Sequence, residues 1–296
     1  MEIRIVAPHE FYELRDLLTG VFSSSNGRET DFTKLFPRLF AQPNAYATAS
    51  HLGAFEDGKL IGTAAMYPLD YVIGTQHIRL IGNGNVAVHE DYRNRGVMSA
   101  ILHEINRICD EIGDVGYLHG NPVRYGRVGY VGCGIEYLLT FQPSEGERYA
   151  FSPMTPDDVP LQQARSERRC DYIKRRPEDF IPALCSGYRE AITVRNKNGV
   201  SVGFLSLNCA TGAVEEFAFD EPREVPAFQA LAQQLGRPVC VRLSGYDVQT
   251  LARCRDHADV KIGQPALFRI INPEPLRRAA QELGLPEDTL YAPYLT

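Results

Sequence analysis

One segment constrains the fold of this chain more than any other: an extended apolar run, a turn with arginine and glycine, and an amphipathic helix follow one another directly. The run Ile78–Val88 leads into the turn Asp91–Gly96, and the stretch Val97–Ile112 follows. Apolar residues recur in that stretch at the spacing of one helical face, at Ile101, Leu102, Ile105 and Ile108. A strand, a tight turn and a helix in this order predict an α/β fold with the helix packed against a sheet.

Hairpin signals surround this unit in the first half of the chain. Asp57-Gly58 separates two runs of strand character, and this dipeptide favours a two-residue hairpin turn. A second hairpin is expected at Gly74-Thr75. The other elements expected here are a helix over Glu10–Phe22, an apolar stretch over Phe32–Phe40, and strands over residues 1–6, 51–55, 60–67, 115–118 and 135–141. Together they predict a mixed, mostly antiparallel sheet flanked by helices.

The segment Gln142–Pro153 is the expected domain boundary, because it is polar and contains proline, glycine and serine. Beyond it the order of elements repeats, so we expect two domains, 1–145 and 146–296, the second a degenerate copy of the first. The elements expected in the second domain are helices over 160–176, 225–235 and 246–255, and strands over 191–195, 201–207, 213–219 and 239–243. Acidic residues and a proline at 220–224 replace the arginine-glycine turn, and they form a poor cradle for an anion.

Composition narrows the class of protein. The seven cysteines are odd in number, scattered and never spaced as Cys-x-x-Cys, so neither a disulfide framework nor a zinc site is expected. A reducing cytoplasm is the expected location, since the sequence has neither a secretory signal pattern nor an apolar run of membrane length. The net charge of −6 argues against a nucleic-acid partner and weakly favours cationic substrates such as amines.

The turn before Val97–Ile112 has the features of an anion site. A helix N-terminus presents unpaired backbone N–H groups and a partial positive charge. Arg93 and Arg95 add charge-assisted hydrogen bonds, Gly96 lets the backbone approach a ligand closely, and Ser99 offers a hydroxyl one turn later. A solvated helix start has the same features, so the pattern alone leaves both interpretations open.

This segment resembles the acyl-CoA-binding motif of the GNAT superfamily, Arg/Gln-x-x-Gly-x-Gly/Ala at a strand-to-helix junction. The match runs over Arg93-Asn94-Arg95-Gly96-Val97-Met98, with Met98 where glycine or alanine is usual. The resemblance implies that Arg93 to Ser99 hold the pyrophosphate of acetyl-CoA, a co-substrate. It also implies that Val86, Ala87 and Val88 bind the pantetheine arm through backbone groups, as an added strand would.

A second resemblance lies further along, in Leu118-His119-Gly120 and Tyr125-Gly126-Arg127-Val128-Gly129-Tyr130. These segments are similar to the enhanced-intracellular-survival branch of bacterial acetyltransferases, which joins two tandem GNAT-like regions to a C-terminal sterol-carrier-like domain. Residues up to about 145 match this branch well, and the next 125 or so match only in element order. The chain ends soon after Phe268–Pro273, so the third domain is expected to be missing.

The branch also implies roles in proton transfer. By resemblance Tyr125 protonates the departing CoA thiolate, while Tyr130 is structural; a tyrosine, with a pKa of roughly 10, carries the proton needed. The general base of the branch is a terminal carboxylate on the missing domain, so it cannot be transferred to this chain. His119, with an ordinary imidazole pKa near 6.5, is the main candidate for the base. The other candidates are Glu56, Asp57 and the free carboxylate of Thr296.

The leading hypothesis is therefore an acetyl-CoA-dependent N-acetyltransferase in which a primary amine attacks the thioester directly, with no covalent enzyme intermediate. The acceptor is a small molecule or a peptide amine; a homo-oligomer is possible, and no metal, nucleic acid or membrane is expected. One alternative is a non-catalytic acyl-CoA-binding or regulatory module. Another is an interaction role for the second half. A hydrolase is disfavoured because no Gly-x-Ser-x-Gly elbow is present.

Overall fold

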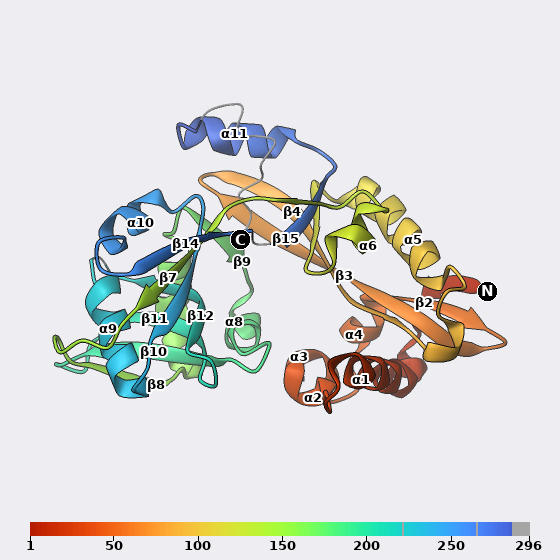
Figure 1. The fold of residues 1–296 in the computed structure, drawn as a ribbon, viewed down its shortest axis with the longest axis horizontal. Helices are drawn as coiled ribbons and strands as arrows, with labels where there is room; N and C mark the ends of the chain where they lie inside the picture. The colour runs from red at the N-terminus through yellow and green to blue at the C-terminus, as the bar shows by residue number, and fades with distance from the viewer. Residues whose placement is uncertain (221, 265, 286–296) are drawn as a thin grey trace. The chain divides into compact units, whose positions relative to one another are not determined.

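The computed structural model describes residues 1–220, 222–264 and 266–285, which divide into two compact units (Figure 1). Unit 1 contains residues 1–71, 76–132 and 266–285, and unit 2 contains residues 72–75, 133–220 and 222–264. The fold is mixed α/β, with two mostly antiparallel sheets flanked by helices, which confirms the predicted fold class. The predicted boundary at residues 145 and 146 lies between two strands of unit 2.

The elements up to residue 133 come first in the chain. They are β1 (Glu2–Ile5), η1 (Pro8–Glu10), α1 (Phe11–Asn26), α2 (Phe32–Leu35), α3 (Pro37–Phe40), α4 (Ala45–Ala49), β2 (His51–Glu56), β3 (Lys59–Ile73), β4 (Gln76–Val88), η2 (Glu90–Tyr92), α5 (Val97–Ile112), β5 (Val115–Leu118), α6 (Pro122–Gly126) and β6 (Val131–Cys133). Two elements at the end of the described chain also belong to unit 1. They are β15 (Ala266–Ile270) and α11 (Glu274–Glu282).

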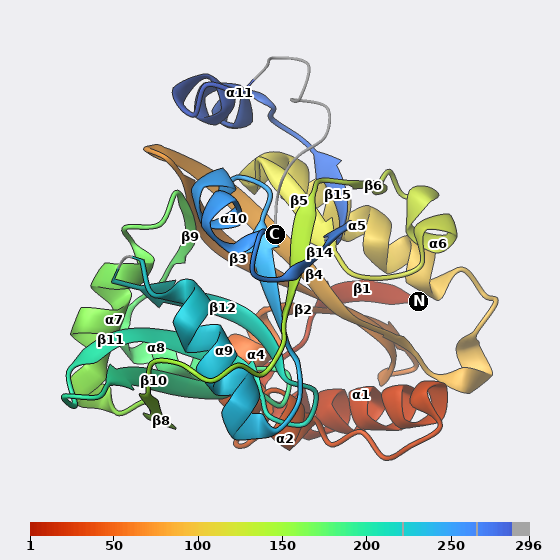
Figure 2. The ribbon, with the colours of Figure 1, turned by 60° about the vertical axis from the view of Figure 1, so that its left-hand side comes forward.

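Helices cover both faces of the sheet in unit 1, whose strands follow the order β1-β2-β3-β4-β5-β15-β6. Figures 1 and 2 show α5 on one side of strands β2 to β4 and α1 on the other. Alternate residues of each strand serve the two faces: Ile61 packs with α5, and its neighbour Leu60 packs with α1. The α5 side buries Ile101, Leu102 and Ile105 completely, as the helical spacing predicts.

A break in this alternation shapes the end of β4. On a regular strand, residues of one face are an even number of positions apart. Ile81 and Val86 are five positions apart, yet both contact the α5 cluster, as does Val88. Ala87 packs on the α1 side. Asn85 lies between Ile81 and Val86 with a φ of 53°, so the backbone shifts by one residue there, as in a β-bulge. The parallel pairing of β4 with β5 ends before this bulge, where Gly82 lies opposite Tyr117.

Strand β15, which was not predicted, lies beside β5. Leu267 to Ile270 pair antiparallel with Leu118 to Val115, and the Phe268 ring stacks on Tyr117 with ring centroids 6.3 Å apart. The strand that follows unit 1 directly, β7 (Glu136–Phe141), pairs with two strands of unit 2 instead. Local pattern predicts a strand at residues 135–141, but strand partners depend on contacts between distant residues.

Unit 2 has a seven-stranded sheet in the order β14-β7-β13-β12-β11-β10-β8. Phe228 and Leu231 of its main helix pack against Phe141 and Phe217 of that sheet. Besides β7, its elements are β8 (Tyr149–Pro153), η3 (Pro156–Asp158), α7 (Val159–Ser166), β9 (Asp171–Lys174), α8 (Pro177–Leu184), β10 (Glu190–Asn196), β11 (Ser201–Asn208), β12 (Ala213–Phe219), α9 (Glu224–Leu235), β13 (Val239–Ser244), α10 (Val248–Cys254) and β14 (Asp259–Gly263).

One predicted element of unit 2 is wrong. The helix expected over residues 160–176 ends at Ser166, and strand β9 occupies Asp171–Lys174. The charged side chains that suggested a longer helix are used in tertiary contacts: Arg169 lies over the Phe217 ring at 4.8 Å, and Arg175 pairs with Glu216 at 2.7 Å. Such contacts override local helix propensity.

Candidate active site

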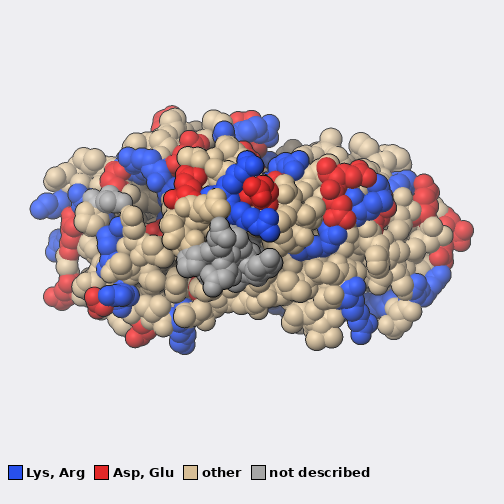
Figure 3. All heavy atoms as spheres, turned by 90° about the horizontal axis from the view of Figure 1, so that it is seen from above, with Lys and Arg blue, Asp and Glu red and all other residues tan. Residues whose placement is uncertain are grey.

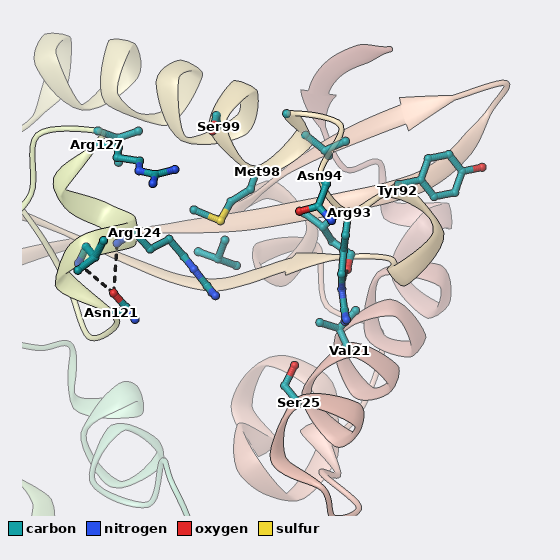
Figure 4. A pocket seen from close by; sticks show the side chains of 16 residues that line it. Val21, Ser25, Tyr92, Arg93, Asn94, Met98, Ser99, Asn121, Arg124 and Arg127 are labelled. Carbon is teal, nitrogen blue, oxygen red and sulfur yellow. Dashed lines mark hydrogen bonds between the residues drawn. The ribbon is translucent and has the colours of Figure 1, made fainter.

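A cavity of about 690 Å³ lies in unit 1 where β4 ends, within the range usual for ligand sites (Figure 4). Its walls come from the end of β4, the turn before α5, the first turn of α5, the region of α6 and the second half of α1. Eight of the ten residues predicted to bind acetyl-CoA line it: Val86, Val88, Arg93, Asn94, Gly96, Val97, Met98 and Ser99.

The turn before α5 is held in a left-handed backbone conformation. Gly96 is the N-cap of α5 with a φ of 79°, and Asn94 has a φ of 63°. Glycine adopts such angles without steric cost, and asparagine tolerates them better than most residues. The Ala100 N–H donates to the Gly96 carbonyl at 3.0 Å, whereas the amide groups before it belong to the first helical turn and have no intrahelical acceptor. These amides and the partial positive charge of a 16-residue helix end at the cavity.

The two arginines of the turn have different surroundings. The Arg93 side chain lines the cavity, and its Nε donates to the Val88 carbonyl at 3.5 Å. Arg95 is outside the lining: its guanidinium pairs with Glu56 at 2.9 Å and lies over the Tyr92 ring at 4.9 Å. Arg95 therefore braces the turn against the β2–β3 hairpin, and Arg93 is the arginine of the turn that can reach a ligand.

The end of β4 presents side chains and backbone to the cavity. Val86 and Val88 line it, but the Ala87 side chain is buried on the α1 side of the sheet. The His89 N–H donates to the Ile61 carbonyl at 2.9 Å, so the β3 side of this strand end is paired. On the β5 side, no strand in the described part of the chain pairs with Val86–Val88, because the register of β4 with β5 stops at Gly82. A ligand with amide groups fits beside such an edge as an added strand.

Both tyrosines of the motif after β5 are buried. The Tyr125 ring packs in the α5 cluster, and a side chain on Gly120 would collide with it. Its hydroxyl makes no hydrogen bond to another described residue, and burial raises the pKa of that hydroxyl. Tyr130 receives a hydrogen bond from Asn83 Nδ2 at 2.8 Å and donates to Asn106 Oδ1 at 3.3 Å. These contacts give Tyr130 a structural role.

The candidate bases are scattered. His119 is exposed directly after β5, with its ring 6.3 Å from that of Tyr117, and it is not among the residues that line the cavity. Glu56 is engaged with Arg95, and Asp57 is exposed at the hairpin turn with a φ of 52°. The Thr296 carboxylate lies outside the described residues.

A buried polar cluster lies at the bulge of β4. His51 is completely buried, and its Nδ1 donates to the Ala47 carbonyl at 2.6 Å, since a carbonyl can only accept. Its Nε2 then accepts from Asn85 Nδ2 at 3.2 Å, and the same amide group donates to the Tyr67 hydroxyl at 2.8 Å. Burial lowers the pKa of His51 to about 4, so the imidazole is neutral at pH 7.

Five further polar residues line the cavity and were not predicted: Ser25, Tyr92, Asn121, Arg124 and Arg127. Asn121 caps α6, accepting from the Val123 and Arg124 amides at 2.9 and 3.2 Å. Asn-Pro before an apolar residue is a helix-start signal, so the cap was readable from the sequence. The sequence does not reveal that the Arg124 and Arg127 side chains point into the cavity, because their direction depends on how α6 packs beside α5.

The described ranges contain neither a membrane-spanning helix nor a metal-binding cluster. No helix within the described ranges is long and apolar enough to span a bilayer. Across the same parts of the chain, no group of three His, Cys, Asp or Glu side chains is arranged to hold a metal ion.

Several solved structures share this fold. A probable N-acyltransferase of unknown function from Enterococcus faecalis aligns with a TM-score of 0.66 and 17% identity, over 93% of this chain and 74% of that one. A GCN5-related N-acetyltransferase from Kribbella flavida aligns with a TM-score of 0.65 and 19% identity, over 94% and 74%. Eis1 from Mycobacterium abscessus aligns with a TM-score of 0.57 and 17% identity, over 92% and 74%. At these identities the likeness concerns the fold.

Sequence comparison identifies a known domain in the first part of the chain. No curated protein matches the sequence. Residues 2–133 match the acetyltransferase (GNAT) domain family, and this range contains β4, the turn, α5 and α6, which form most of the cavity wall. This part of the chain, a little under half of its length, therefore carries a GNAT acetyltransferase domain.

Proposed function

We propose that this protein transfers an acetyl group from acetyl-CoA to a primary amine. The observation that carries the proposal is the cavity at the end of β4. It combines an unpaired strand edge, the N-terminus of a long helix and an arginine within one unit. The strand edge suits the amide groups of pantetheine, and the helix N-terminus with Arg93 suits the diphosphate.

The reaction is a direct attack on the thioester. The neutral amine adds to the acetyl carbonyl carbon, a carbon–nitrogen bond forms, and the carbon–sulfur bond then breaks. The amine loses a proton to a base or to water, and the CoA thiolate gains one. Tyr125 is the proposed donor of that second proton, because a tyrosine hydroxyl, with an ordinary pKa of roughly 10, carries its proton at neutral pH. The base remains a choice among His119, Glu56, Asp57 and the Thr296 carboxylate.

A second candidate function is binding of acyl-CoA without turnover. It is favoured by Met98, whose side chain lines the cavity at a motif position where glycine or alanine is usual (Figure 4). It is also favoured by the ion pair of Glu56 with Arg95, which leaves that carboxylate poorly placed to accept a proton.

A panel of amines separates the two functions. The protein is incubated with acetyl-CoA and with small or peptide primary amines, and both the free CoA thiol and the acetylated amine are measured. We expect thiol release that depends on one class of amine and matches the acetylated product in amount. Binding of acetyl-CoA with no product from any amine would support the binding module instead.

A further inference from the structure

The cavity in unit 1 carries more positive charge than one diphosphate uses. Its lining includes Arg93, Arg124 and Arg127 and contains no Asp or Glu among the described residues. Figure 4 shows Arg93 on the wall formed by the turn, and Arg124 and Arg127 extending from the region of α6. The two walls face one cavity, so a bound ligand would meet cationic groups on both sides.

Arg124 and Arg127 lie on a segment, residues 121–128, that is anchored to the rest of unit 1. Tyr125 and Val128 are buried on the side that packs against α5, while Arg124 and Arg127 are exposed. The Val128 carbonyl accepts from Asn106 Nδ2 of α5 at 2.8 Å, which ties the segment after α6 to that helix. The Asn121 cap fixes its beginning. The arginines are therefore presented by an anchored segment.

Arg124 and Arg127, like Arg93 in the same cavity, form no ion pair with any residue that the structure describes. Nearby arginines have carboxylate partners: Arg79 pairs with Asp114, Arg95 with Glu56, Arg107 with Glu104 and Arg269 with Asp110. Basic and acidic side chains are likewise interspersed on the face shown in Figure 3. Two cations without a counter-charge, facing a cavity in a chain of net charge −6, indicate an anionic ligand group.

We propose that Arg124 and Arg127 bind the 3′-phosphate of coenzyme A. The inference rests on the proposed function, and it follows by elimination over the groups of that ligand. The diphosphate is served by the amides of α5 and Arg93, and the pantetheine arm and adenine are uncharged. The 3′-phosphomonoester is the anionic group that remains, with a charge of about −1.5 to −2 at pH 7. Arginine binds such a group through parallel N–H···O bonds.

Calorimetric titration with CoA and with dephospho-CoA, which lacks only the 3′-phosphate, tests the proposal. The wild type is expected to bind CoA about 10- to 100-fold more tightly than dephospho-CoA, the range for charge-assisted hydrogen bonds. The double variant Arg124→Gln/Arg127→Gln should bind CoA as weakly as dephospho-CoA, and its affinity for dephospho-CoA should equal that of the wild type. The matched control Arg93→Gln should weaken both ligands by the same factor.

Three results would overturn the proposal, and they have different meanings. Equal weakening of both ligands in the double variant would place the arginines on the diphosphate. Equal affinity of the wild type for both ligands would show that the 3′-phosphate is not recognised. In either case the proposed function stands, whereas a wild type that binds neither ligand refutes the proposed function itself. Thermal unfolding of each variant checks its fold, and the single variants Arg124→Gln and Arg127→Gln replace the double variant if it unfolds.

Discussion

At the scale of single residues, Tyr125 combines a structural and a chemical property. Its ring fills space against Gly120 and the α5 cluster, and its hydroxyl makes no hydrogen bond to another described residue. The residue is buried, but this hydroxyl is not one of the fully buried polar atoms that lack a partner, so water can reach it. The hydroxyl of Tyr130, five residues later, is hydrogen-bonded to Asn83 and Asn106. Of the two tyrosines, Tyr125 is thus the one whose hydroxyl no described residue engages, although Tyr125 is not among the residues that line the cavity.

Tyr125→Phe separates the two properties, because it keeps the ring and removes the acidic proton. If the hydroxyl protonates the leaving thiolate, turnover with a working amine should fall by roughly 10²- to 10⁴-fold, while the affinity for acetyl-CoA changes little. The matched control is Tyr130→Phe, which should reduce thermal stability more than the rate of the chemical step. Wild-type turnover in Tyr125→Phe, where chemistry limits the rate, would remove Tyr125 from the mechanism.

His51 makes the stability of unit 1 depend on pH. Its pKa is about 4 in the folded protein and near 6.5 in an unfolded chain, so between these values the unfolded state binds a proton that the native state does not. The free energy of unfolding is therefore highest above pH 6.5 and decreases as the pH falls towards 4. The decrease due to His51 is about 2 kcal/mol between pH 7 and pH 5. Urea unfolding at the two pH values should show this loss in the wild type and a smaller loss in His51→Gln. Equal losses in both proteins would show that His51 does not titrate as proposed.

At the scale of elements, the sequence predicted those features that depend on neighbouring residues, such as helix bounds and tight turns. The bounds of α5 follow from Gly96 and from the spacing of its apolar residues, and the β2–β3 hairpin follows from Asp57-Gly58. The strand over Glu136–Phe141 was predicted as an element, but its pairing with β13 and β14 was not. Strand β15 was missed as a partner of β5, because its pairing joins residues about 150 positions apart.

The same distinction applies to the candidate site. The turn Arg93–Ser99 is contiguous, so its residues could be named together from the sequence. Arg124 and Arg127 reach the cavity only because α6 folds back along α5, which no pattern near them reveals. Arg95 was expected to contact phosphate, yet the structure places it on Glu56, 39 residues earlier in the chain. Its partner could not be identified from the turn alone.

Strand β15 should be essential for the stability of unit 1, although it lies at the far end of the described chain. Phe268 is 1% exposed and stacks on Tyr117. Phe268→Ala should lower the free energy of unfolding by about 3–5 kcal/mol, as is usual for a buried phenylalanine. Ile270→Ala is the control, since Ile270 is 37% exposed on the same strand and should cost far less. Chemical unfolding curves give both values, and similar small losses would contradict the packing described for β15.

At the scale of the whole molecule, the two units are similar in order of elements but differ at the helix that follows the central strand. In unit 1 that helix starts after a glycine with a φ of 79° and faces a cavity. In unit 2 the N-cap of α9 is Arg223, with a φ of −119°, and the first helical residue is the buried Glu224, which pairs with Arg253 at 2.6 Å. A carboxylate at the N-terminus takes the place that a phosphate would need.

Calorimetric titration of the full chain with acetyl-CoA tests the central claim most directly, in the wild type and in two variants at Gly96. The account predicts one site per chain in the wild type. Gly96→Asn tolerates the left-handed backbone and should weaken binding moderately, whereas Gly96→Asp adds a negative charge beside the phosphates and should weaken it much more steeply. Two sites per chain, or affinity for acetyl-CoA unchanged in a folded Gly96→Asp variant, would contradict the assignment of the site to this turn.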